Sequence, residues 1–205
     1  MACQCKEKKH KTSLVVLTGG PGAGKTATLQ VASRIFCKHV SILPEAASII
    51  FSGGFIRGST LAARKGAQRA IFHVQRELEE IVLEENEAAI ALCDRGTLDG
   101  LAYWPVDKKN FWADLETTKE KEYKRYAAVI HLRTPDIHNG YNHNNPIRLE
   151  TAVEASKIDE KILDVWADHP NRFVVDSSTD FVEKVKNVLD ILRPLIPKCC
   201  LNAKK

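Results

Sequence analysis

The chain has 205 residues, of which 44% are hydrophobic, and a formal net charge of +4 at pH 7. This length suits one domain with a sizeable core. No apolar run reaches the length of a membrane-spanning helix, and the first residues are polar and basic, unlike a secretion signal, so a soluble cytoplasmic protein is expected. A small, dispersed positive charge does not indicate a nucleic-acid-binding protein.

The two ends of the chain are predicted to be tails. Residues 1–12 are expected to form a disordered basic tail, residues 13–197 a single domain, and residues 198–205 a C-terminal tail. The basic tail carries Lys6, Lys8, Lys9 and Lys11. Such a charge run either keeps a protein soluble or contacts an anionic surface such as a membrane.

The six cysteines do not form a recognisable framework. Two pairs fall in the predicted tails and two single cysteines in a predicted helix and strand: Cys3, Cys5, Cys199, Cys200, Cys37 and Cys93. This spacing matches neither a secreted disulfide scaffold nor a zinc-binding set. Free thiols are therefore expected, with a metal or redox site between the tails as the alternative.

Residues 19–26 read GGPGAGKT and fit the phosphate-loop pattern G-x-x-x-x-G-K-[ST]. An apolar run at residues 14–17 predicts a strand before the loop, and residues 27–38 predict a helix after it. Glycines let backbone N–H groups converge on phosphate oxygens, and the helix N-terminus favours negative charge. Lys25 is expected to reach the β- and γ-phosphates, and the Thr26 hydroxyl to bind Mg²⁺. The expected nucleotide-contacting residues are Gly19, Gly20, Pro21, Gly22, Ala23, Gly24, Lys25, Thr26 and Thr28.

Residues 40–43 predict a second strand, which is followed by Pro44 and Glu45. Ligands of open α/β sheets bind beyond the carboxyl ends of the strands. Glu45 is therefore a candidate to orient or deprotonate an acceptor hydroxyl, or to bind magnesium through water. An exposed loop acid is the alternative reading. Residues 51–59 are loop-like, and Arg57 there either grips an anion or is surface charge.

A long helix is predicted from residue 60 to about residue 86. Its expected buried stripe consists of Leu61, Ile71, Val74, Leu78, Ile81 and Val82. The acidic run near its end is expected to mark a solvated face and consists of Glu79, Glu80, Glu84 and Glu85.

Residues 88–93 predict a buried strand that ends at Asp94, which is followed by Arg95. An Asp at this place is the expected second magnesium anchor, beside Thr26. ATPases that drive hydrolysis commonly place a Glu after this Asp. Arg95 instead suits bidentate binding of a phosphate, with a structural salt bridge as the alternative.

The second half of the chain begins with an aromatic-rich segment, residues 98–126, which either lines a pocket for a planar acceptor or packs an inserted helical segment. A strand at 127–132, a long polar loop at 136–146 and a helix at 150–167 follow. Loops of this length are usually functional, so we expect a lid in which Arg133 and Arg148 close on the transferred phosphate. His131, His138 and His143 match no zinc pattern and are expected to be polar loop or strand-end residues.

Residues 172–176 predict the last strand, and residues 181–192 predict a closing helix. The alternation of strands and helices predicts an α/β fold with five parallel strands and helices on both faces.

Several motifs give the chain a resemblance to known families. GGPGAGKT, Glu45, DRG at 94–96 and LRTP at 132–135 resemble P-loop kinases of the thymidylate kinase and deoxynucleoside kinase branch. The set PEAA, DRGTLDGLAYWP, NNPIRLE and VVDSSTDF resembles more closely an AAA-domain group related to the ribosylnicotinamide kinase domain of bacterial NAD regulators. The resemblance covers roughly residues 13–192.

The resemblance implies a three-layer P-loop NTPase fold with strand order 2-3-1-4-5. It implies ATP·Mg binding by residues 19–26, with GTP as the other candidate nucleotide, and magnesium and phosphate handling by Asp94 and Arg95. Arg133 or Arg148 takes the role of lid arginine, and Glu45 that of the acceptor-hydroxyl carboxylate. Gln75 sits where nucleoside kinases often read the acceptor base.

Two functions remain open at this point. The first is a phosphotransferase that acts on a nucleoside, nucleotide or related small molecule by in-line transfer. The second is a nucleotide-dependent switch or GTPase that binds a partner or an anionic membrane through the basic tail. The chain lacks an Asn-Lys-x-Asp signal for guanine, and Arg95 disfavours a hydrolytic motor.

Overall fold

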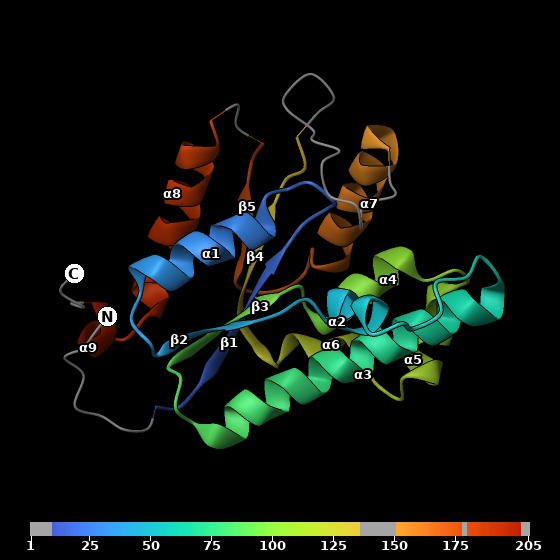
Figure 1. Cartoon of the computed structure of the whole chain (residues 1–205), viewed down its shortest axis with the longest axis horizontal. Helices are drawn as coiled ribbons and strands as arrows, with labels where there is room; N and C mark the ends of the chain where they lie inside the picture. The colour runs from blue at the N-terminus through green and yellow to red at the C-terminus, as the bar shows by residue number, and fades with distance from the viewer. Residues whose placement is uncertain (1–9, 136–150, 178–179, 202–205) are drawn as a thin grey trace.

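The computed structural model describes residues 10–135, 151–177 and 180–201. Five parallel strands form one sheet in the order β2-β3-β1-β4-β5 (Figure 1). They are β1 (Ser13–Thr18), β2 (Val40–Leu43), β3 (Ile90–Asp94), β4 (Tyr126–Leu132) and β5 (Arg172–Val175). The expected fold class and strand order are therefore confirmed.

Helices cover both faces of this sheet. They are α1 (Lys25–Ile35), α2 (Ala46–Ser52), α3 (Leu61–Glu85), α4 (Gly100–Tyr103), α5 (Lys108–Asp114), α6 (Lys119–Tyr123), α7 (Ala152–Val165), α8 (Phe181–Leu192) and α9 (Lys198–Leu201). Short 3₁₀ turns are η1 (Thr97–Asp99) and η3 (Arg193–Leu195). No helix in these ranges is long and apolar enough to cross a membrane.

Two apolar clusters lie on opposite faces of the sheet, because successive side chains of a strand point to opposite sides. Val15 and Leu17 of β1 pack in the cluster with α1 and α8, whereas Leu14 and Val16 pack in the cluster with α3, α4 and α7. Figure 1 shows α1 and α8 together on one side and α3 with α4 on the other. The sheet is thus buried on both faces, as its apolar strands predict.

The buried face of α3 differs from the expected stripe. Leu61 and Ile81 are 53% and 54% exposed, so their assignment to the core was wrong. The helix instead buries a more polar set, which consists of Ala67, Phe72, Gln75, Glu79 and Val82. An apolar period alone did not identify this face, because Glu79 has its partners far along the chain and Gln75 in turn bonds to Glu79.

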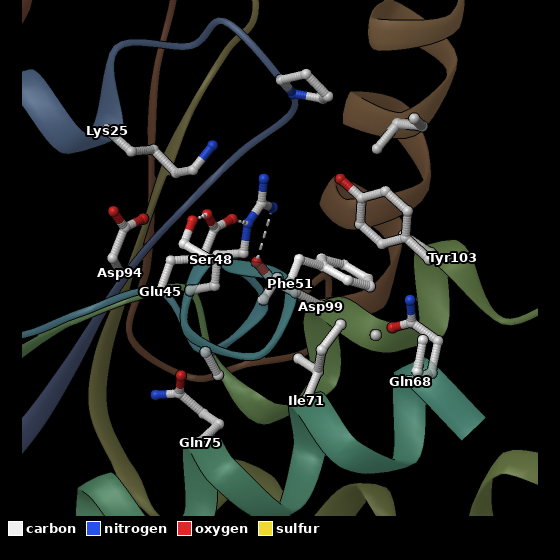
Figure 2. A pocket seen from close by; sticks show the side chains of 18 of the residues that line it. Lys25, Glu45, Ser48, Phe51, Gln68, Ile71, Gln75, Asp94, Asp99 and Tyr103 are labelled. Atoms are coloured by element: carbon white, nitrogen blue, oxygen red, sulfur yellow. Dashed lines mark hydrogen bonds and ion pairs between the residues drawn. The ribbon is translucent and has the colours of Figure 1, made fainter. Parts of the chain in front are cut away.

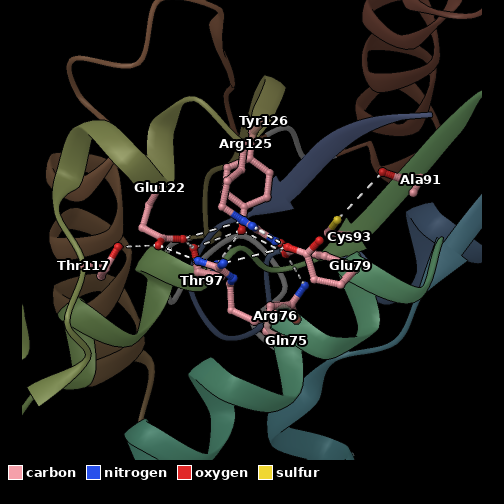
Figure 3. A network of polar contacts seen from close by, with 11 residues as sticks. Gln75, Arg76, Glu79, Ala91, Cys93, Thr97, Thr117, Glu122, Arg125 and Tyr126 are labelled. Carbon is pink, nitrogen blue, oxygen red and sulfur yellow. Dashed lines mark hydrogen bonds and ion pairs between the residues drawn. The ribbon is translucent and has the colours of Figure 1, made fainter. Parts of the chain in front are cut away.

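Glu79, which was expected on a solvated face, is fully buried. It lies within the network of polar contacts that Figure 3 shows. Its Oε2 accepts a hydrogen bond of 2.6 Å from Arg125, and its Oε1 accepts bonds of 2.8 Å from Gln75 and 2.9 Å from Tyr126. Burial raises the pKa of Glu79, and the Arg125 guanidinium opposes that rise. The backbone N–H of Thr97 donates to the Tyr126 hydroxyl at 2.9 Å. The network thereby ties α3 to the turn that follows Arg95.

The described parts of the two expected tails are packed. His10 and Thr12 are each 7% exposed, and the Thr12 hydroxyl donates to the Ala88 carbonyl at 2.7 Å. At the other end, α9 is helical and Cys200 is 1% exposed. Residues 10–12 and 198–201, which were expected to belong to the tails, thus include buried side chains. Residues 1–9 and 202–205 lie outside the described ranges.

The segment after β2 also differs from the sequence analysis. Residues 46–52, the last two of which were expected in a loop, form the short helix α2. Its N-cap is Glu45, so the candidate acceptor carboxylate stands at the junction of β2 and α2.

Candidate nucleotide-binding site

The phosphate loop joins β1 to α1 through backbone conformations that require glycine. Gly19 has φ of 132°, and a Cβ built there would lie 2.0 Å from the Leu132 carbonyl oxygen. Gly24 has φ of 90° directly before the first turn of α1. An L side chain at either position would be strained, so the glycines of the motif are explained by the turn itself.

Lys25 is the first residue of α1 and is 7% exposed. Its Nζ donates to the carbonyl oxygens of Gly19 and Gly20, both at 2.9 Å. Desolvation, and then the positive charge of Arg95, lower the pKa of Lys25 to about 8. The ammonium group thus lies at the loop, and it loses its proton at a lower pH than an ordinary lysine does.

Thr26 and Asp94 meet where β3 ends beside α1. The Thr26 hydroxyl donates to Asp94 Oδ2 at 3.1 Å. Among the described residues, Asp94 Oδ1 is buried and has no hydrogen-bond partner. Burial raises the pKa of Asp94. A hydroxyl and an unpaired carboxylate oxygen are ligands that Mg²⁺ prefers, so these two residues fit the ion.

Arg95 and Glu45 form a close pair next to the loop. The Arg95 backbone has φ of 78°, a conformation uncommon for residues other than glycine and often found at functional sites. Its Nε lies 2.5 Å from Glu45 Oε1, and its Nη1 donates to the Gly19 carbonyl at 3.3 Å. The Ser48 hydroxyl donates to Glu45 Oε2 at 2.5 Å. Although burial acts to raise it, Arg95 and Ser48 lower the pKa of Glu45 to about 2.

Asp99 also contacts this pair, and it was not predicted as a site residue. Its Oδ2 lies 3.5 Å from Arg95 Nη1 and accepts a bond of 2.5 Å from the Thr18 hydroxyl. Its Oδ1 accepts a bond of 2.7 Å from Trp166 Nε1. The spacing from Arg95 gave no signal, because Arg95 has a left-handed backbone and the 3₁₀ turn that contains Asp99 begins only at Thr97.

Asp159 of α7 forms a hydrogen bond with the phosphate loop. Its Oδ1 accepts a bond of 2.8 Å from the Gly20 backbone N–H and lies 2.9 Å from His131 Nε2. Its Oδ2 lies 3.0 Å from Arg133 Nε. No local pattern indicated this residue, because it lies 139 positions from Gly20.

The predicted lid arginines have different outcomes. Arg133 pairs with Asp159 and with Glu160, and it is not among the described residues that line the pocket. Arg148 and the loop 136–146 lie outside the described ranges, as do His138 and His143. Thr28, expected to contact nucleotide, directs its hydroxyl to the Gly24 carbonyl at 2.9 Å.

A cavity of about 870 Å³ extends from the phosphate loop to α3 and α4 (Figure 2). Lys25, Asp94 and Glu45 line one end. Side chains not assigned to the site by motif line the other, namely Gln68, Ile71, Tyr103 and Trp104, together with Gln75. Of the aromatic-rich segment, Tyr103 and Trp104 therefore face the cavity, whereas Phe111 is fully buried and packs edge-on against Trp104.

Comparisons with known proteins agree with this geometry. Residues 14–184 match the family model described as an AAA domain. No curated protein sequence matches the chain. A solved structure of thymidylate kinase from Candida albicans superposes with a TM-score of 0.64 at 14% identity, over 90% of this chain and 92% of that one. The expected AAA-domain resemblance is confirmed, and the thymidylate kinase likeness shows a shared fold.

Proposed function

The chain belongs to the AAA-domain family, and on that premise we propose that it is a P-loop phosphotransferase. The donor is a magnesium-bound nucleoside triphosphate, with ATP as the first candidate. The acceptor is a nucleoside, nucleotide or related small molecule that carries a hydroxyl or phosphate group.

One observation carries the proposal: the cavity at the phosphate loop extends as far as α3 and α4. The whole cavity has a volume of about 870 Å³, which falls within the range for small-molecule sites. Hydrolysis needs room for one water molecule only, whereas transfer to an organic acceptor needs space for that acceptor next to the γ-phosphate. Glu45 and Arg95, which contact each other, both line this cavity.

The end of the cavity at α3 and α4 suits a planar, polar acceptor. Gln68, Gln75 and Tyr103 offer amide and hydroxyl groups next to the apolar Ile71. The Gln75 amide is oriented by the network behind it, because its Nε2 donates to the buried Glu79 at 2.8 Å. A fixed amide recognises a hydrogen-bonding edge better than a freely rotating one, since less conformational entropy is lost on binding.

Glu45 positions the acceptor in this mechanism. A carboxylate whose pKa is about 2 is a weak base at neutral pH, so its main contribution is to accept a hydrogen bond from the attacking hydroxyl and align it. Arg95 and Lys25 offset the negative charge that develops on the transferred group. Mg²⁺, held by Thr26 and Asp94, would supply further charge neutralisation.

The test is acceptor-dependent ADP release over a panel of nucleosides and nucleotides. The wild-type protein is expected to release ADP at least tenfold faster with one acceptor class than with water alone. Glu45→Gln keeps the side-chain size but removes the charge that pairs with Arg95 and holds the acceptor oxygen in place. The misaligned hydroxyl is expected to lower this rate about 100-fold while nucleotide affinity changes little. Glu85→Gln, an exposed carboxylate at the end of α3, is the matched control and is expected to behave as wild type. A protein that binds nucleotide well but responds to no acceptor contradicts the proposal.

A further inference from the structure

A second cluster of chemically reactive side chains lies far from the phosphate loop. His10, His39 and Cys200 come from three separate segments, and their ligand atoms all lie within 4.8 Å of one another. His10 precedes β1 and His39 precedes β2, so the cluster stands at the N-terminal edge of the parallel sheet. The phosphate loop follows β1 and stands at the opposite edge. A strand of six residues separates the edges by about 20 Å.

The backbone fixes all three residues in place. The His10 N–H donates to the Asn86 carbonyl at 2.8 Å, at the end of α3. The His39 carbonyl accepts bonds from Ala89 at 2.7 Å and from Ile90 at 3.1 Å, where β3 begins. The Cys200 N–H donates to the Pro197 carbonyl at 2.8 Å.

The three side chains are buried and close together. His10, His39 and Cys200 are 7%, 5% and 1% exposed. Cys200 Sγ lies 3.4 Å from His39 Nδ1, and the two imidazole rings have centroids 4.5 Å apart with a tilt of 56°. Ligand atoms on a tetrahedral zinc ion are separated by roughly 3.3–3.8 Å, given Zn–N and Zn–S bonds of about 2.0 and 2.3 Å. The Cys200–His39 distance already matches this spacing.

We propose that His10, His39 and Cys200 bind a transition-metal ion of the zinc class. One thiolate and two imidazoles are the ligands that Zn²⁺ prefers, whereas Mg²⁺ prefers oxygen. The fourth ligand of a tetrahedral ion comes from outside these three residues. The sequence left open a metal site between the two tails, but it did not indicate His10 and His39 as ligands, because the three residues lie at positions 10, 39 and 200.

The bound ion fastens both ends of the chain to the sheet. It connects residue 10 with residue 200, and so restrains α9 and the segment before β1. An ion that binds the folded state alone stabilises that state by mass action. A hundredfold excess of Zn²⁺ over its dissociation constant is expected to raise the melting temperature by about 5–10 °C.

The test uses the full chain without an affinity tag, purified with a chelator and then titrated with Co²⁺ in the absence of nucleotide. We expect one Co²⁺ per chain and a near-ultraviolet absorption from thiolate-to-cobalt charge transfer, which Zn²⁺ abolishes by displacement. The absorption requires a thiolate ligand, so Co²⁺ bound to oxygen at Asp94 does not produce it. A titration that ends without this absorption overturns the proposal.

Matched variants locate the site. Cys200→Ser is expected to remove the charge-transfer absorption, and His39→Gln to weaken Co²⁺ binding at least tenfold. Cys37→Ser is the control. Cys37 is a buried thiol in the same apolar cluster as Cys200, but it does not belong to the group formed by His10, His39 and Cys200. Nucleotide binding verifies that each variant is folded. The assignment is contradicted if folded Cys200→Ser keeps the absorption. It is also contradicted if folded Cys37→Ser loses the absorption while Cys200→Ser does not.

Discussion

The affinity for nucleoside triphosphate is expected to fall at alkaline pH because of Lys25. Desolvation and Arg95 lower the pKa of this ammonium group to about 8 in the free protein. A polyphosphate held at the loop favours the charged form, so the pKa rises again in the complex. Binding is therefore strongest below about pH 8, takes up a proton above it, and weakens as the pH rises.

The size of the effect follows from the protonated fraction of Lys25. With a pKa of about 8, that fraction falls from roughly three quarters at about pH 7.5 to roughly 3% at about pH 9.5. The association constant is then expected to fall about 20-fold over this interval, if the pKa in the complex returns to its ordinary value. The triphosphate itself is already ionised across the same range.

Titration calorimetry of a nonhydrolysable triphosphate measures both the association constant and the number of protons taken up on binding. Experiments in buffers of different ionisation enthalpy are expected to show proton uptake that approaches one per nucleotide near pH 9. Lys25→Met is expected to bind weakly with no uptake. Lys184→Met is the control, since Lys184 is another buried lysine with a lowered pKa, and it donates to the Arg133 carbonyl outside the pocket. An affinity that is constant with pH, or uptake that persists in Lys25→Met, refutes the role of Lys25.

Three further substitutions are expected to separate structural from functional roles. Glu79→Ala removes the hydrogen-bond acceptor of the buried Gln75 and Tyr126 and one partner of the half-buried Arg125, which keeps Glu80 and Glu122. It is expected to cost about 2–3 kcal/mol in urea unfolding, against less than about 0.5 kcal/mol for the exposed Glu84→Ala. Equal costs would contradict the network. Gly66→Ala has open space around its new Cβ and is expected to stabilise α3 by about 0.5–1 kcal/mol, so a loss of stability would count against the described helix. Asp94→Asn is expected to weaken Mg²⁺-dependent nucleotide binding at least tenfold while Mg²⁺-free binding changes little, and unchanged Mg²⁺ dependence would remove Asp94 from the metal site.

Local features were predictable from the sequence. The loop, its flanking strand and the start of its helix lie within a short segment, so the motif and its context could be read together. Parallel pairing then follows because each strand is separated from the next by a helical segment, which requires a crossover. These rules led to the five-stranded sheet found in the structure.

The contacts that were missed join residues far apart in the chain. Asp159 reaches Gly20 across 139 positions, and Glu79 reaches Arg125 across 46. The periodic pattern of a helix does not distinguish a buried carboxylate from an exposed one. The partner that offsets the cost of burying the charge lies in a distant part of the sequence. The acceptor end of the pocket is similar, since Gln68 and Tyr103 line one cavity only after α3 and α4 pack, and of this end the resemblance indicated Gln75 alone.

The fate of the γ-phosphate tests the central claim most directly. The wild-type protein is incubated with γ-labelled ATP, Mg²⁺ and a panel of nucleosides and nucleotides, and the products are separated by chromatography. The proposed phosphotransferase places most of the label on one class of organic acceptor, and Lys25→Ala abolishes that product. Label that appears only as inorganic phosphate with every acceptor contradicts the account, whatever the affinity for ATP.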